Sequence, residues 1–150
     1  TTSNHASDMD MTDPVNGVRT KFAPLAAELG IDLVFQGHDH IYARTKPLAN
    51  NKVAAKGTVW VIPGTAGPKT YYRNKKMDPG YWELFAKADE NAAAKYGPDP
   101  KDDSRPVRAA VQHFLAVTVN GRTLTVKTWE IDQNKNKGQP YEIDSFELKK

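Results

Sequence analysis

No cysteine occurs among the 150 residues of this chain. This absence excludes a disulfide framework and any metal site built from thiolates. It also fits a bacterial protein that works outside the cytoplasm, and we expect a secreted or extracytoplasmic location. No apolar run approaches the roughly 18 residues that a membrane-spanning helix needs, so we expect no membrane span. No stripe of alternating basic and aromatic residues is present, so we find no nucleic-acid-binding signature.

The remaining composition is that of an ordinary globular protein. Apolar residues make up 39% of the chain and charged residues 26%, which is typical of a soluble domain with its own core. The net charge of +3 comes from scattered lysines. It indicates a solvated surface, although a basic surface also attracts phosphorylated substrates by electrostatic steering.

The amino-proximal part predicts one amphipathic helix after a polar segment. Asp13 and Pro14 are typical of a helix cap and a first helical position. Gly30 is a natural helix end, and Pro24 is expected to kink the helix or to split it in two. Four apolar residues recur at helical spacing and predict the buried face: Val18, Phe22, Leu25 and Leu29.

Strands are predicted on either side of a less regular middle segment. Residues 31–35 and 58–62 favour strands, the first of them buried on both faces. Asn120-Gly121 predicts a hairpin with a type I′ turn between strands 111–119 and 123–131. Residues 143–148 predict a last edge strand. The middle segment, about 68–107, is interpreted as an insertion with a helix over 81–96. Its aromatic residues are expected to pack on the sheet rather than to form a lid over the site: Tyr71, Tyr72, Tyr81, Trp82 and Phe85.

The most informative motif is Gly37-His38-Asp39-His40, which follows the strand predicted over 31–35. We expect Gly37 to let the backbone turn where that strand ends, which is where open α/β sheets place their ligands. The two histidines are two residues apart, so both imidazoles can lie on one side of the connection. Imidazole is a common ligand of zinc, manganese and iron. The motif therefore predicts a pair of metal ligands.

The motif and the residues after it resemble a known family. Tyr42, Arg44 and Thr45 follow the histidines, a Gly-rich turn follows the strand in segment 57–67, and residues 144–149 form a closing segment. Together these features resemble the calcineurin-like metallophosphoesterases, most of all their purple-acid-phosphatase-like branch. The resemblance implies an α/β fold, the carboxyl-terminal half of a four-layer α/β/β/α sandwich. It would have a mixed sheet and a terminal antiparallel hairpin, and residues 1–150 would be its carboxyl-terminal part.

The resemblance also implies a reaction, a metal pair and a partner segment. It implies a dinuclear site of iron, manganese or zinc that hydrolyses phosphate esters, with His38 and His40 each binding one metal. The remaining family motifs lie upstream of G-H-x-H and none is intact here. The implied partner is therefore a missing amino-terminal half, and the isolated chain is expected to be inactive.

The resemblance and the local chemistry also suggest roles for residues near the two histidines. His5 is the candidate that hydrogen-bonds or protonates the substrate. Asp39 and Tyr42 are expected to support the metal ligands without binding the metals themselves. Arg44 is a candidate for binding the substrate phosphate, although pairing with a structural carboxylate is the commoner role of such a residue.

Two other interpretations remain open at this point. One is a non-catalytic β-rich binding or structural domain that uses Trp60, Trp82 and Trp129 as contact surfaces. The other is a mononuclear metal module with His5 or Asp8 as a third ligand. His113, in an alternating strand, is expected to be a packed or a surface residue of the sheet rather than a metal ligand.

Overall fold

The computed structural model describes residues 18–67, 69–71, 79–88, 107–109 and 111–150. His5, Asp8, the cap at Asp13, Tyr72 and most of the predicted insertion lie outside these ranges. The elements, in chain order, are α1 (Val18–Glu28), β1 (Leu33–Phe35), β2 (Tyr42–Thr45), β3 (Leu48–Ala49), β4 (Lys52–Val53), β5 (Val59–Pro63), β6 (Lys69–Tyr71), α2 (Pro79–Trp82), β7 (Phe85–Ala88), β8 (Val107–Ala109), β9 (Val111–Asn120), β10 (Thr123–Asp132), a 3-10 turn (Asn136–Gly138) and β11 (Tyr141–Lys149).

A mixed four-stranded sheet has the order β1-β5-β2-β7. β1 runs parallel to β5, whereas β2 is antiparallel to both of its neighbours. Because side chains alternate along a strand, β5 contributes to the packing on both faces of this sheet. Trp60 packs with residues of α1 on one face, and Val59 and Val61 pack against the second sheet on the other.

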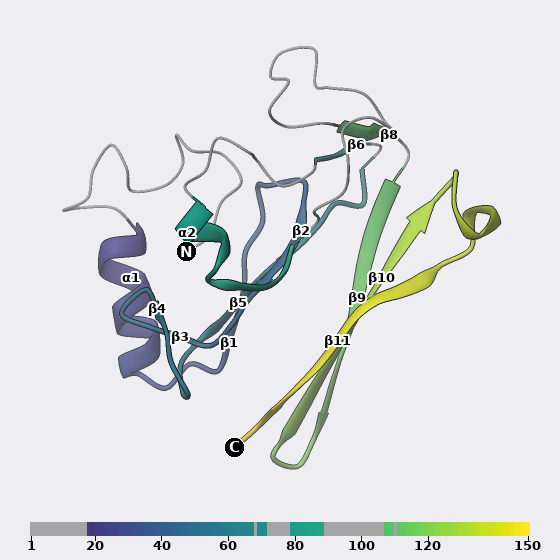
Figure 1. The fold of residues 1–150 in the computed structure, drawn as a ribbon. Coiled ribbons are helices and arrows are strands. Elements are labelled where there is room, and N and C mark those ends of the chain that lie inside the picture. Colours follow the sequence, from purple (N-terminus) through teal and green to yellow (C-terminus); the bar gives the residue numbers. More distant parts are fainter. Residues whose placement is uncertain (1–17, 68, 72–78, 89–106, 110) are drawn as a thin grey trace.

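The second sheet is antiparallel, with the order β11-β10-β9. Leu115, Phe146 and Leu148 from this sheet pack against the first sheet and close the core between them. Figure 1 shows the resulting layers: α1, the mixed sheet, and the long strands β9 to β11. The described residues are thus mostly strand in mixed and antiparallel sheets, with few helices, which agrees with a carboxyl-terminal α/β portion. No helix in these ranges is both long and apolar enough to cross a membrane.

The predicted buried face of α1 is wrong at three of its four residues, and the side chain of the fourth, Val18, lies outside the described residues. Ala23 and Ala26 are buried, whereas Phe22, Leu25 and Leu29 are 43%, 44% and 67% exposed. The helix packs through its small side chains because alanine lets it approach Leu48 and Trp60 of the cluster beneath it closely. Pro24 lies inside one uninterrupted helix, so the helix is not split. The end at Gly30 is confirmed, with a positive φ of 69°.

Two expectations, one for a strand and one for a helix, are corrected by the strand pairing. β1 is an edge strand of the four-stranded sheet, and its last residue, Phe35, is 43% exposed. The strand is therefore not buried on both faces. The helix predicted over 81–96 is interrupted, because residues 85–88 form β7 and pair with β2. Pairing with an available sheet edge has overridden a helical composition there.

The terminal hairpin is confirmed, with a different turn. Asn120 pairs with Thr123, so the loop consists of Gly121 and Arg122. Of the two, only Gly121 has a positive φ, of 56°. Positive φ at the first central residue alone is the pattern of a type II′ turn rather than the predicted type I′. The predicted last strand is also confirmed, as β11 at the edge of its sheet.

Candidate metal-binding site

The segment 36–41 crosses the carboxyl end of the four-stranded sheet. It leaves β1 on one side of β5 and enters β2 on the other side. The Gln36 amide donates to the carbonyl of Val61 in β5 over 2.9 Å, and Tyr42 pairs with Pro63 at the end of β5. The turn at residues 64–67 leaves β5 at this same edge. The histidine segment and the Gly-rich turn therefore share one end of the sheet.

The three residues in the centre of this segment differ in exposure. His38 and His40 are exposed, whereas Asp39 between them is only 3% exposed and lies within the protein. The prediction placed the turn at Gly37, but the positive φ, 77°, is at His38. A left-handed conformation costs free energy at a residue with a Cβ. The backbone strain of this turn therefore lies at a candidate ligand.

The described residues fit part of a metal centre. Two exposed imidazoles on one short segment suit zinc, manganese or iron. The described ranges contain no group of three or more histidine, cysteine or acidic side chains placed to hold one ion. A dinuclear centre needs several carboxylates and imidazoles. His38 and His40 thus fit as two donors of a larger set.

Directly after the histidines, Tyr42 and Arg44 in β2 both bind Asp144 in β11. The Tyr42 hydroxyl donates to Asp144 Oδ2 over 2.8 Å. The Arg44 guanidinium donates from Nε to Oδ2 over 2.7 Å and from Nη2 to Oδ1 over 3.1 Å. Arg44 also lies over the ring of Phe146, 4.5 Å from its centroid. This bidentate pair joins the two sheets next to the histidine segment.

Burial and hydrogen bonding shift the pKa values in this group. Burial by itself raises the pKa of the Asp144 carboxyl, but hydrogen bonds from Arg44 and Tyr42 outweigh it and hold this pKa below its ordinary value. Burial also raises the pKa of the Tyr42 phenol far above its ordinary range, and the Asp144 carboxylate adds to this shift. Asp144 is thus ionised and Tyr42 neutral at physiological pH.

A second buried polar group lies beside the first. His113 Nε2 is 2.9 Å from Glu130 Oε2, and the Tyr141 hydroxyl donates to the other oxygen of Glu130. The His113 ring stacks on Tyr42, with centroids 6.3 Å apart and planes at 27°. Of the two positions predicted for His113, packed or at the surface of the sheet, the structure shows the packed one, since its side chain is fully buried.

His113 also supports the turn at the end of β5. Its backbone amide donates to the carbonyl of Thr65 over 2.7 Å. A Cβ added to Gly64 would lie 2.4 Å from His113 Nδ1, and Gly64 has a φ of 86°. Glycine is therefore required at position 64 by both the backbone conformation and the imidazole against it.

Asp144 and Glu130 were assigned no role from the sequence. A signal for Asp144 does exist, because it stands two and four residues before Phe146 and Leu148, which pack between the sheets. An acidic residue in such a row needs a cationic or hydrogen-bonding partner. The sequence does not say which residue provides that partner.

The aromatic residues of the competing interpretation are mostly packed. Trp60 is 2% exposed and so cannot serve as a contact surface. Trp82 is half-buried against Tyr81 and Phe85. Trp129 is half-buried and stacks on Phe114, which is 44% exposed. The expectation that Tyr81 and Phe85 pack on the sheet is confirmed, since both belong to a buried cluster with Ile62.

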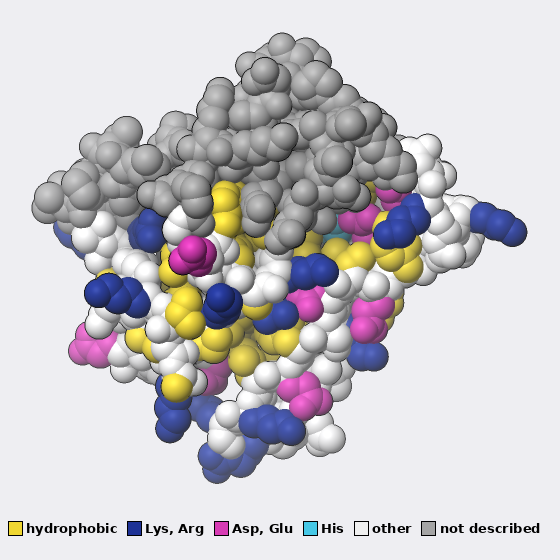
Figure 2. Space-filling view, in the orientation of Figure 1, with side chains coloured by type: hydrophobic (Ala, Val, Ile, Leu, Met, Phe, Trp, Pro, Cys, Tyr) yellow, Lys and Arg dark blue, Asp and Glu magenta, His cyan; other side chains and the backbone are white. Residues whose placement is uncertain are grey.

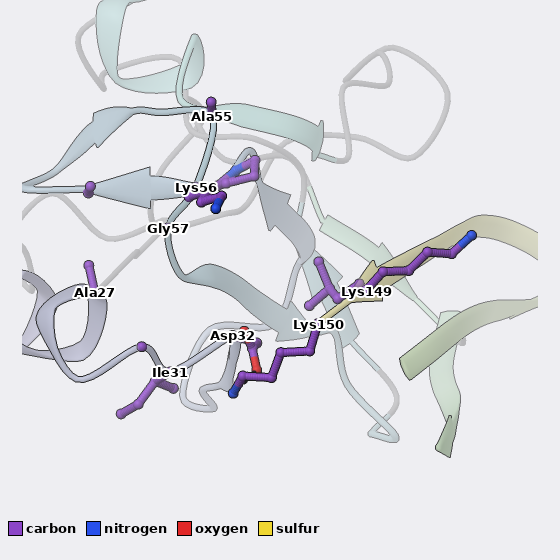
Figure 3. Close-up of a pocket in the computed structure, with 12 residues that line it drawn as sticks. Ala27, Ile31, Asp32, Ala55, Lys56, Gly57, Lys149 and Lys150 are labelled. Carbon is purple, nitrogen blue, oxygen red and sulfur yellow. Dashed lines mark ion pairs between the residues drawn. The ribbon is translucent and has the colours of Figure 1, made fainter. Parts of the chain in front are cut away.

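A cavity of about 530 Å³ lies at the other end of the sheet. Figure 3 shows Asp32, just before β1, next to Lys150, whose Nζ is 2.9 Å from Asp32 Oδ2. Lys56 and Gly57, which precede β5, also line this cavity. In the view of Figure 2, Lys and Arg side chains gather towards the lower edge of the molecule. Because His38 and His40 follow the opposite end of β1, this cavity is separate from the candidate metal ligands.

Comparison with known proteins gives one partial similarity. The chain is 38% identical over 66 residues to purple acid phosphatase 18 of Arabidopsis thaliana. The match covers 43% of this chain and 15% of the Arabidopsis protein, so the chain spans a small part of that relative's length. No protein-family model matches the chain, and no solved structure matches it. The similarity indicates a relationship to purple acid phosphatases and nothing narrower.

Proposed function

We propose that this chain supplies His38 and His40 to the dinuclear centre of a metal-dependent phosphoesterase. Residues 1–150 would be the carboxyl-terminal part of its catalytic domain, with an insertion at about 68–107. The described layers would belong to a four-layer sandwich that an amino-terminal half of the same protein completes. The observation that carries the proposal is that both histidines are exposed, two residues apart, in the segment that crosses the carboxyl end of the sheet.

The proposal assigns each residue a limited role. His38 and His40 would hold iron, manganese or zinc, and the partial similarity to a purple acid phosphatase supports a phosphate ester as substrate. When bound, such a metal pair supplies Lewis acidity and a hydroxide near neutral pH. His5 would hydrogen-bond or protonate the substrate. Arg44 would act through Asp144, with which it is paired, rather than on the phosphate.

The test uses a protein in which the proposed amino-terminal half precedes this chain. It is assayed with 4-nitrophenyl phosphate and bis(4-nitrophenyl) phosphate, which separate monoesterase from diesterase activity. His38→Ala and His40→Ala should each lower kcat/KM at least about a hundredfold, since even residues that only support a metal ligand are worth 10–100-fold. Lys52→Ala, at an exposed position in β4, is the control. Unchanged hydrolysis in both histidine variants would show the proposal to be wrong.

A further inference from the structure

The histidine segment is held unequally at its two ends. On one side it continues from β1, which has three residues and pairs only with β5 in the described structure. On the other side it enters β2, which pairs with both β5 and β7. The position of His40, two residues before Tyr42, is therefore determined mainly from the β2 side.

Asp144 fixes that side to the second sheet. It accepts hydrogen bonds from Tyr42 at 2.8 Å and from two nitrogens of Arg44 at 2.7 and 3.1 Å. The Asp144 side chain is 9% exposed and that of Arg44 is 17% exposed. Two parallel hydrogen bonds to one carboxylate restrain rotation as well as distance. The start of β2 is thus restrained at two positions that face β11.

Glu130 fixes the neighbouring turn in a similar way. It binds His113 and Tyr141 with its two oxygens. His113 in turn packs on Gly64 and holds Thr65 by a backbone hydrogen bond. The stack of His113 on Tyr42 joins the two groups. We call the whole set the inter-sheet polar network. Its members are Tyr42, Arg44, His113, Glu130, Tyr141 and Asp144.

We propose that Asp144 and Glu130 are positioning residues, which hold the His38–His40 segment and the Gly64–Gly67 turn in place from the second sheet. This inference rests on the proposed function in one respect, that His38 and His40 bind metal. Each carboxylate acts through residues that precede or follow the candidate site, rather than on a metal or a substrate. The whole second sheet thereby has a role at the site in addition to closing the core.

The first experiment is site-resolved hydrogen exchange of the 150-residue chain. Asp144→Asn should raise the exchange rate of amides in residues 36–41 about tenfold, because charge-assisted hydrogen bonds are lost locally. Glu130→Gln should do the same in residues 64–67. Amides of β10 exchange through global unfolding, so their acceleration reports the loss of overall stability, whereas amides of residues 36–41 exchange through local opening and report the loss of local restraint. Glu142→Gln is the matched control, because Glu142 lies in the same strand as Asp144. Its substitution removes an exposed ion pair, in which Lys127 Nζ is 3.5 Å from Glu142 Oε2.

A second readout separates the two proposals. Zn²⁺ is titrated into the folded variants and the imidazole signals of His38 and His40 are followed by NMR. Asp144→Asn should weaken binding about fivefold or more and Glu142→Gln less than about twofold. If the imidazole signals of the unsubstituted chain do not change when Zn²⁺ is added, the proposed metal function is wrong, and hydrogen exchange alone decides whether Asp144 and Glu130 are positioning residues. If segment 36–41 exchanges no faster in Asp144→Asn than in Glu142→Gln, the positioning role is wrong.

Discussion

His38 is both a candidate metal ligand and a residue with a φ of 77°. A left-handed backbone costs a residue with a Cβ about 1 kcal/mol or more, and glycine is free of this cost. We therefore expect His38→Gly to be about 1 kcal/mol more stable than His38→Ala, although both lose the imidazole. Urea unfolding of the two variants measures this difference. Equal stabilities would show that the left-handed turn is not maintained in solution.

Gly64 permits a still sharper comparison. Its φ is 86°, and an added Cβ would overlap the imidazole of His113. Gly64→Ala should lower the free energy of unfolding by about 3 kcal/mol, from backbone strain and overpacking together. Gly37→Ala is the control, because a Cβ added at position 37 would meet nothing within 4 Å and the φ there is not positive. A loss of less than about 1 kcal/mol at position 64 would contradict the packing of His113 on this glycine.

Asp144 should make the stability of the chain depend on acid pH. Its pKa is depressed in the folded state, so in the unfolded state the carboxyl takes up its proton at a higher pH. The stability it contributes is therefore complete above the ordinary carboxyl pKa of about 4 and is lost as the pH falls through the folded value.

Asp144→Asn tests this dependence. It should cost about 2 kcal/mol at pH 7, from the weakened bonds to Arg44 and Tyr42. The difference in free energy of unfolding between this variant and the unsubstituted chain should narrow as the pH is lowered from about 5 towards 2. Protonation of Asp144 in the unsubstituted chain removes the same charge that the substitution removes. Chemical unfolding at a series of pH values measures this difference, with Glu142→Gln as the control. A difference that stays constant across this range would contradict a depressed pKa.

At the scale of elements, two substitutions in α1 test which of its faces is packed in the core. Ala26 is fully buried, while Leu29 is 67% exposed. Ala26→Leu should destabilise the chain by about 2 kcal/mol through overpacking, although leucine is the more apolar residue. Leu29→Gln should change stability by no more than about 0.5 kcal/mol. Thermal or urea unfolding compares the two variants. A larger loss of stability at position 29 than at position 26 would support the buried face predicted from the sequence.

The elements differ in how well the sequence predicts them, for physical reasons. The hairpin was predictable because Gly121 and the alternating strands around it act over a short stretch of chain. The face of α1 was not, because helical periodicity identifies large apolar residues and cannot weigh them against the close approach that Ala26 allows. The strand at 85–88 was also missed, because it depends on β2, which lies some forty residues earlier in the chain.

At the scale of the whole molecule, the site too combines residues that a local motif identifies with residues that only long-range contacts bring together. His38 and His40 stand in one contiguous motif, so the sequence alone identified them as candidates. Asp144 meets Tyr42 across 102 residues, and Glu130 reaches His113 only because β9 and β10 pair. Such contacts depend on how the two sheets stack. No local pattern in a single sequence determines that stacking.

The whole-molecule prediction concerns metal content. After exposure to manganese, zinc or iron and dialysis against metal-free buffer, the 150-residue chain should retain fewer than about one ion, because two imidazoles alone bind divalent ions weakly and reversibly. Weak binding seen before dialysis should disappear in the His38→Ala/His40→Ala double variant and persist in Glu142→Gln. Metal analysis by mass spectrometry measures both. Two retained ions per chain would mean that this chain, alone or with a second copy, completes the centre, and the need for an upstream half would then be wrong.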